Sequence, residues 1–207
     1  MSSSLIDLLS PHHEHEAGKM YGVAVGIVTN NKDPDGMARI KVKFPWLSDD
    51  QESWWARVGT PMAGGGRGAY FLPEVDDEVL VAFEHGDVRF PYIVGSLWNG
   101  HDQPPTTNGD GQNNIREIKS RSGHILRLDD TSGDEKIEVI DKTGSNSITL
   151  KSSDNSITIT CNGRMKLQAM GIEISSQADV KISANSTMDV DAQAVMNING
   201  SIVNINS

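Results

Sequence analysis

Residues 148–207 carry a triplet of apolar, polar and apolar positions that returns about every eight residues. Alternation over three residues sends the outer two side chains to one face of the backbone and the middle one to the other. The residues between triplets are mostly Ser, Asn, Gly, Ala and Gln, which favour tight turns. Each triplet is therefore predicted to be a short strand with one dry face. The side chains predicted to form a shaft core are Ile148, Leu150, Ile157, Ile159, Met165, Leu167, Ile172, Ile174, Val180, Ile182, Met188, Val190, Met196 and Ile198.

A fixed short period indicates a repeat architecture in which no single unit buries its apolar face alone. Eight residues suffice for one face and one corner, which favours a β-prism. Three chains wound around a common axis would pair every strand edge with a neighbour. We therefore expect an intertwined trimeric β-helix or β-prism needle. Two alternatives are a single-chain β-helix and a disordered polar tail.

The aromatic residues and prolines are confined to the N-terminal half. All 11 aromatic residues lie between Tyr21 and Trp98, and all 8 prolines lie at or before Pro105. A thin core has no room for rings, and a central strand ladder excludes proline. Both absences favour a narrow, fully hydrogen-bonded shaft in the C-terminal half.

The first half is predicted to consist of short strands and turns. Apolar alternation at 23–27 and 38–44, around a turn at 30–36, predicts a hairpin. Five or six strands without a helical period favour a small Greek-key barrel, most simply an OB-fold. The fold class is thus all-β, with an OB-fold barrel before the needle. The further strands expected in the barrel are 54–58, 68–72, 78–83 and 92–97.

Two more strands, at 125–128 and 137–140, are expected between the barrel and the triplets. Their spacing of about eleven to twelve residues predicts a shaft that is wider here than further on. The domains expected from these patterns are a leader at 1–19, the OB-fold domain at 20–98, a connector at 99–114, wide neck strands at 115–147 and the octad-repeat spike at 148–207.

Charge narrows the possible partners. The net charge is −10, and only −1 of it arises from Ser145 onward, so residues 1–144 carry −9. An acidic surface repels phosphate backbones and acidic membranes, which argues against nucleic-acid binding. The single Cys161 excludes an internal disulfide. The chain also lacks a signal-peptide pattern and an apolar run of transmembrane length.

The sequence offers few candidates for catalytic or metal-binding residues. His12, His13 and His15 do not have the spacing of a zinc-protease motif and have no further ligands at a supportive distance. The acidic pairs 76–77 and 129–130 are turn residues by context. We expect no catalytic residue, no metal site and no cofactor, and an enzyme is the less favoured interpretation.

An OB-fold that binds nucleic acid or another ligand, with a polar repeat tail, is the main alternative function. Such a module stacks bases on exposed rings within a basic groove. The net charge has the wrong sign for that role. The alternation of the rings with Val and Ala suits a barrel core or a protein interface better. The rings concerned are those of Trp46, Trp54, Trp55, Tyr70 and Phe71.

Several segments resemble the phage baseplate assembly protein V and VgrG spike family, and the resemblance covers essentially everything after residue 20. One departure is Asp76, where the family usually has glycine. The segments that carry the resemblance are DPDGMARIKVKFPW (33–46), WARV (55–58), PMAG (61–64), GRG (66–68), FLPEV (71–75), DEVLVAFEHGD (77–87), GSLW (95–98), SRSGH (120–124), DDT (129–131) and the octads.

The resemblance implies a homotrimer that docks its barrels on a baseplate hub and pierces the target membrane mechanically. It implies a phage tail baseplate, an extracellular injection particle assembled in the cytoplasm, or a type VI-like system. From the short connector and the chain end we expect none of the enzyme domains that some family spikes carry. The chain end also lacks the His-x-His pair of some members, so we expect Ile202, Val203 and Ile205 to contact a separate PAAR-like tip protein.

Overall fold

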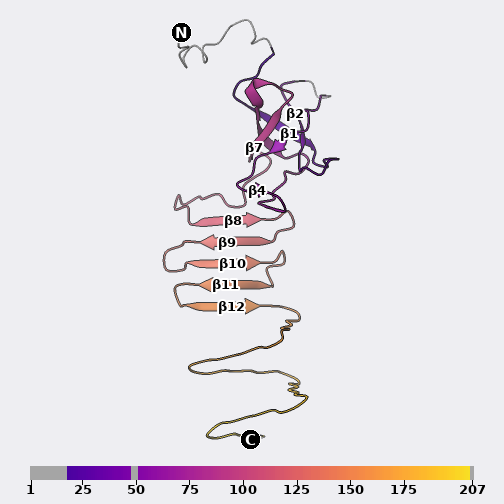
Figure 1. Ribbon diagram of the computed structural model, residues 1–207. Helices are drawn as coiled ribbons and strands as arrows, with labels where there is room; N and C mark the ends of the chain where they lie inside the picture. Colours follow the sequence, from indigo (N-terminus) through magenta and orange to yellow (C-terminus); the bar gives the residue numbers. More distant parts are fainter. Residues whose placement is uncertain (1–17, 48–50, 206–207) are drawn as a thin grey trace, which may run out of the picture. The chain divides into compact units, whose positions relative to one another are not determined.

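A computed structural model describes residues 18–47 and 51–205. The chain divides into two compact units, Met1–Thr160 and Cys161–Ser207. The first unit is built from two antiparallel-rich sheets and a small hairpin, and the described residues contain no α-helix (Figure 1). The helical element present is the 3₁₀ turn η1, Glu84–Gly86. The expectation of an all-β chain with no helical domain is confirmed for the described residues.

The first sheet forms the predicted barrel. Its strand order is β2-β1-β6-β7-β3, and a separate hairpin pairs β4 with β5. A bridge between Ile40 and Ala56 joins the segment before β2 to the segment before β3, which brings the two edges of the sheet together. The strands are β1 (Val23–Asn30), β2 (Lys41–Lys43), β3 (Arg57–Val58), β4 (Ala63–Gly64), β5 (Arg67–Gly68), β6 (Glu78–Phe83) and β7 (Pro91–Ser96).

Aliphatic side chains from four of these segments fill the barrel. Because strand side chains alternate between faces, Ala24 and Val28 point inward on β1, whereas Val23 is exposed. Gly26 lies on the inward face, where a Cβ atom would come within 3.2 Å of Val42 and Val81. The fully buried side chains of this core are Val28, Ile40, Val42, Val79, Val81 and Ile93.

Most of the strands predicted in this domain are present. The hairpin of β1 and β2 and the strand at Glu78–Phe83 are confirmed. The strand expected at 54–58 is reduced to Arg57–Val58. The strand expected at 68–72 is wrong, because pairing is confined to Arg67–Gly68 and residues 69–72 join no ladder of the described chain.

Asp33 and Asp76 lie in two of the turns that carry the sequence resemblance. Asp33 accepts hydrogen bonds from the Arg39 guanidinium, at 2.7 and 2.8 Å, and from the backbone N–H groups of Asp35, Met37 and Arg39. The Arg39 bonds hold the pKa of the Asp33 carboxyl well below its usual range. Asp76 has a φ of 75°, in the left-handed region that glycine adopts most easily. A glycine would adopt this backbone conformation more easily than Asp76 does.

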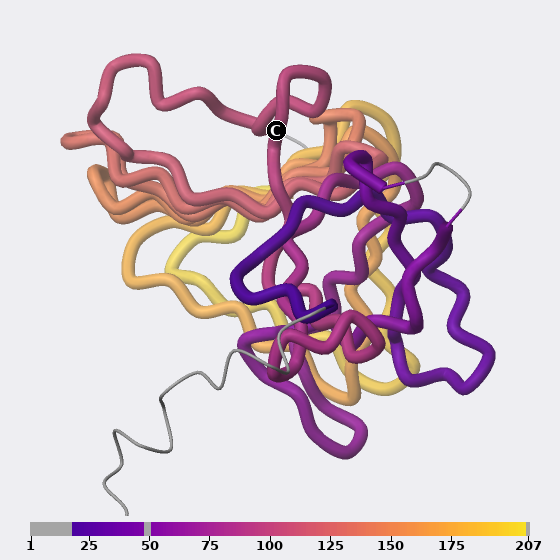
Figure 2. Tube along the Cα trace, turned by 90° about the horizontal axis from the view of Figure 1, so that it is seen from above, coloured from indigo at the N-terminus to yellow at the C-terminus, as the bar shows by residue number. Residues whose placement is uncertain are grey.

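The second sheet is a five-stranded antiparallel meander in which each strand pairs with the next along the chain. Seen along the stacking direction, the five strands lie over one another (Figure 2). The strands expected at 125–128 and 137–140 are confirmed. The first two octad triplets belong to this sheet, which continues as far as Thr160. The strands are β8 (Ile115–Lys119), β9 (Ile125–Asp129), β10 (Lys136–Ile140), β11 (Ser147–Lys151) and β12 (Ser156–Thr160).

The second unit, residues 161–205 as described, has bends and extended segments but no assigned strand. Its Cα trace turns back in wide loops (Figure 2). The prediction that every triplet is a strand is thus correct for the first two and wrong for the later six in the single chain. A strand is defined by its ladder, and these triplets meet no neighbouring strand within one copy.

Candidate functional site

One face of the second sheet is made of aliphatic side chains, and we call it the apolar face. The register places Leu126, Val139, Ile148 and Ile159 side by side in one row across four strands. A second row, two residues along each strand, holds the cross-strand partners Leu128, Ile137, Leu150 and Ile157. The apolar face consists of Ile118, Leu126, Leu128, Ile137, Val139, Ile148, Leu150, Ile157 and Ile159.

Every side chain of the apolar face is exposed in the single chain, with exposed fractions between 40% at Leu150 and 70% at Ile157. Burying an aliphatic side chain of this size stabilises a protein by about 1.5–3 kcal/mol relative to leaving it exposed. For the whole face the gain is on the order of 10 kcal/mol, since the side chains are already partly covered by their neighbours. A contiguous exposed face of this kind marks an interaction surface.

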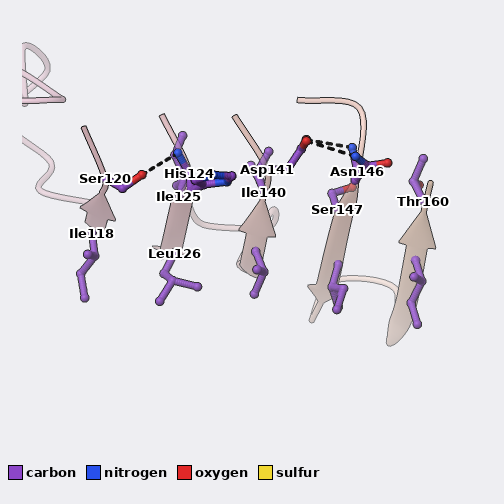
Figure 3. A pocket seen from close by; sticks show the side chains of 13 residues that line it. Ile118, Ser120, His124, Ile125, Leu126, Ile140, Asp141, Asn146, Ser147 and Thr160 are labelled. Carbon is purple, nitrogen blue, oxygen red and sulfur yellow. Dashed lines mark hydrogen bonds between the residues drawn. The ribbon is translucent and has the colours of Figure 1, made fainter. Parts of the chain in front are cut away.

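The apolar face ends in a hollow of about 530 Å³ with a polar rim. Figure 3 shows Ile118, Leu126 and other aliphatic side chains beneath the turns that join the strands. On the rim, the Ser120 hydroxyl accepts the backbone N–H of His124 at 3.0 Å. The Asp141 carboxylate accepts the side-chain and backbone N–H groups of Asn146, both at 3.1 Å. These bonds hold two turns on the same side of the sheet.

The opposite face carries a central row of polar side chains from the middle positions of the five strands. Glu117, Arg127, Glu138, Thr149 and Thr158 are successive cross-strand partners in this row. Arg127 pairs with Glu117 at 2.7 Å and with Glu138 at 3.5 Å. The bond to Glu117 raises the pKa of Arg127 above its ordinary value. The sheet therefore has one charged face and one apolar face.

Asp134 connects the β9–β10 turn to the neighbouring strand. Its carboxylate accepts from Lys151 at 2.7 Å and from Lys136 at 2.9 Å. The bond to Lys151, followed by that to Lys136, lowers the pKa of Asp134 to about 2. Because the folded-state pKa is depressed, the stability that this group adds is complete above its ordinary value near 3.8. That stability is lost as the pH falls toward 2.

We expect Asp134→Asn to flatten the acid dependence of unfolding. The variant should unfold at a lower temperature than the wild type at pH 5, and this difference should shrink as the pH falls from 4 to 2. Thermal unfolding followed by circular dichroism across this range measures both effects. Asp110→Asn, in the connector, is the matched control and should leave the pH profile unchanged. Parallel profiles for Asp134→Asn and the wild type would contradict the assignment.

The structure brings together only part of the predicted shaft core. Ile148, Leu150, Ile157 and Ile159 lie on the apolar face. The remaining members, from Met165 to Ile198, are exposed in the second unit and form no cluster within one chain. The three residues predicted to contact a tip protein, Ile202, Val203 and Ile205, are exposed as well.

Sequence reasoning did not assign five members of the apolar face to the shaft core. Their signal is the alternation within β8, β9 and β10, which matches that of the triplets. It was obscured by the longer turns, which break the period of eight. The five are Ile118, Leu126, Leu128, Ile137 and Val139.

The five rings considered for stacking are not part of the barrel core, so the core interpretation is wrong for them, while the alternative of a protein interface stays a prediction. Trp46, Trp54, Tyr70 and Phe71 are each more than half exposed. Trp55 is half-buried, and the cationic groups of Arg39 and Lys41 lie 5.8 and 5.5 Å from its ring centre. Apart from Phe83, the core instead uses smaller aliphatic side chains, because a closed barrel of short strands has little interior volume.

The residues considered for chemistry lie apart from one another or outside the described part. His12, His13 and His15 fall outside the described residues. Asp77 accepts the backbone N–H of Glu74, and Asp129 accepts the hydroxyl of Thr131, so both hold turns. Residues 18–47 and 51–205 contain no group of three or more His, Cys, Asp or Glu side chains able to hold a metal ion. The same segments contain no helix long and apolar enough to span a membrane.

Residues 24–98 match the family model of the Type VI secretion system/phage-baseplate injector OB domain. The chain is 30% identical over 142 residues to the Type VI secretion system spike protein VgrG4b of Pseudomonas aeruginosa, covering 62% of this chain and 18% of that protein. It is 30% identical over 128 residues to the spike protein VgrG3 of Vibrio cholerae, covering 58% and 13%.

The chain is also 29% identical over 128 residues to the actin cross-linking toxin VgrG1 of Vibrio cholerae, covering 58% of this chain and 12% of the toxin. It therefore spans less than one fifth of the length of these curated relatives. The matched part includes the barrel, whose strands and turns carry the sequence resemblance. Residues 24–98 thus match an injector OB domain, and the chain is similar to the phage baseplate protein V/VgrG-like spike family.

Proposed function

We propose that this protein is the central spike of a contractile injection apparatus, and that it acts as a homotrimer. The observation that carries the proposal is the apolar face, whose aliphatic side chains are all exposed in one copy. The octads that follow repeat the same apolar pattern, so further copies of the chain would supply a continuous cover. The names of two relatives as spike proteins support this role.

In this proposal each part of the chain has its own role. The OB domain docks on a baseplate hub, the second sheet forms the wide neck, and the octads form a thin shaft. Ile202, Val203 and Ile205 present an apolar end to a PAAR-like tip protein. Force reaches the target envelope through a rigid body, because no strand could leave an intertwined shaft without breaking its bonds to both neighbours. The spike breaches the membrane mechanically and uses no catalytic residue or cofactor.

The solution mass tests this proposal. Light scattering should give a trimer for the full chain, and a monomer for a chain that ends at Asn114, before the second sheet begins. A third chain that ends at Thr160 retains the whole apolar face and separates the role of the neck from that of the octads. A full-length monomer would overturn the trimeric spike and favour the alternative of an OB module with a repeat tail.

A further inference from the structure

The central row of the second sheet alternates in charge along its first strands. Glu117, Arg127 and Glu138 succeed one another as direct cross-strand partners. The single guanidinium bridges the two carboxylates on either side of it. Cross-strand ion pairs of this kind stabilise a sheet, whereas like charges placed opposite one another destabilise it. The oppositely charged side chains that pair across this sheet thus occupy the middle positions of β8, β9 and β10.

The same position carries alternating charges in the octads of the second unit. The middle residues of four successive triplets are Lys166, Glu173, Lys181 and Asp189. Their order is positive, negative, positive, negative. The later middle positions are uncharged, as are those of β11 and β12. Four alternating charges at one structural position in consecutive repeats form a pattern of the same type as the bonded row of the second sheet.

These four side chains form no ion pair with one another within one chain. The described residues of the second unit contain no strand ladder and no salt bridge. The middle residue of a three-residue strand faces the middle residue of its neighbour whether the two strands run parallel or antiparallel. Neighbouring strands are about 4.8 Å apart, within reach of a lysine and a carboxylate. A second copy of the chain supplies the missing neighbour.

We propose that Lys166, Glu173, Lys181 and Asp189 form an ion ladder between neighbouring copies of this chain. The inference rests on the proposed trimer and adds the residues that align its strands. In a shaft of three wound chains, each triplet lies next to the following triplet of another copy. Lys166 then lies beside Glu173, Glu173 beside Lys181, and Lys181 beside Asp189.

The ladder also selects the register of the shaft. The apolar positions are nearly equivalent from one octad to the next, so they distinguish poorly between alignments that differ by one repeat. A chain displaced by one repeat would place Lys166 beside Lys181 and Glu173 beside Asp189. Both contacts join like charges. The alternating row therefore disfavours the misaligned shaft that the apolar pattern alone permits.

Paired charge variants of the full chain test the ladder. The double variant Lys166→Glu/Lys181→Glu makes the row wholly acidic, and Glu173→Lys/Asp189→Lys makes it wholly basic. Each variant alone should lose trimer in light scattering at low salt, or unfold at a temperature lower by about 5 °C. The combined fourfold variant reverses every charge and should recover wild-type behaviour. Salt near 1 M should reduce the differences.

Co-expression of the acidic and basic variants with different tags shows whether the ladder joins separate chains. Mixed trimers should exceed the random proportion. The control is Asp179→Lys/Asp191→Lys, which changes the charge by the same amount outside the middle positions and should show a smaller preference for the acidic variant. If the acidic variant formed mixed trimers equally often with the basic variant and with the control, the preference would arise from net charge alone. That result would overturn the ladder.

The remaining outcomes separate the ladder from the spike proposal. A trimeric wild type whose variants match it in mass and thermal stability overturns the ladder alone. Variants that are destabilised singly but show no preference for mixed trimers place the contacts within one chain, which overturns the proposal as made. A monomeric wild type overturns both the ladder and the trimeric spike.

Discussion

Val139→Asp is expected to abolish the trimer while leaving the OB domain folded. Val139 lies on the central strand β10, between Leu126 on β9 and Ile148 on β11. In the single chain it is 44% exposed, so one copy tolerates a carboxylate there. In the proposed assembly each copy would bury that charge without a partner, at a cost of about 5 kcal/mol per chain from lost burial and desolvation. Light scattering and analytical ultracentrifugation measure the loss.

Thr158→Asp is the matched control for this experiment. It introduces the same carboxylate in the same sheet, but on the opposite face, where Thr158 is exposed beside Thr149. The control should keep the wild-type mass. If Val139→Asp also remained a trimer at micromolar concentration, the apolar face would not be the assembly surface.

Ile40→Ala is expected to destabilise the barrel by about 3 kcal/mol without changing the mass of the trimer. Ile40 is fully buried, and its backbone exchanges hydrogen bonds of 3.0 and 2.7 Å with Ala56 where the two edges of the sheet meet. Removing three carbon atoms leaves a cavity next to this junction, and the short strands around it have few other contacts with which to collapse. Thermal unfolding followed by the tryptophan fluorescence of the barrel measures the change.

Met37→Ala is the control, because Met37 is 59% exposed in the turn before Ile40. Its loss should shift the unfolding free energy by no more than about 0.5 kcal/mol. A barrel that tolerated Ile40→Ala equally well would show that the contact between the two edges contributes little to its stability. A change in trimer mass would place part of the assembly in the barrel.

Much of the barrel can be predicted from local patterns in the sequence. The strand at Glu78–Phe83 has strict alternation, and its inward residues Val79, Val81 and Phe83 are all buried. The hairpin of β1 and β2 follows from a turn in which Asp33 binds its own neighbours. Such short-range bonds depend on a few consecutive residues, so a sequence pattern can reveal them.

The positions of the rings were harder to predict. An exposed aromatic side chain and a buried one occupy the same alternating positions in a sequence. Trp54 is exposed and Trp55 half-buried, although they are neighbours in the chain. Which of them is covered depends on Arg39 and Lys41, which reach Trp55 from a different part of the chain. Long-range contacts of this kind leave no local signal.

The sequence by itself determined the all-β class, the OB domain and the apolar period of the C-terminal half, because each depends on the alternation of neighbouring side chains. The tertiary structure alone decided that the apolar face begins at β8 and includes Leu126 and Val139. It also showed that the octads after Thr160 have no ladder within one chain. The physical reason is that a strand requires a partner, and the identity of that partner depends on cross-strand register rather than on local pattern.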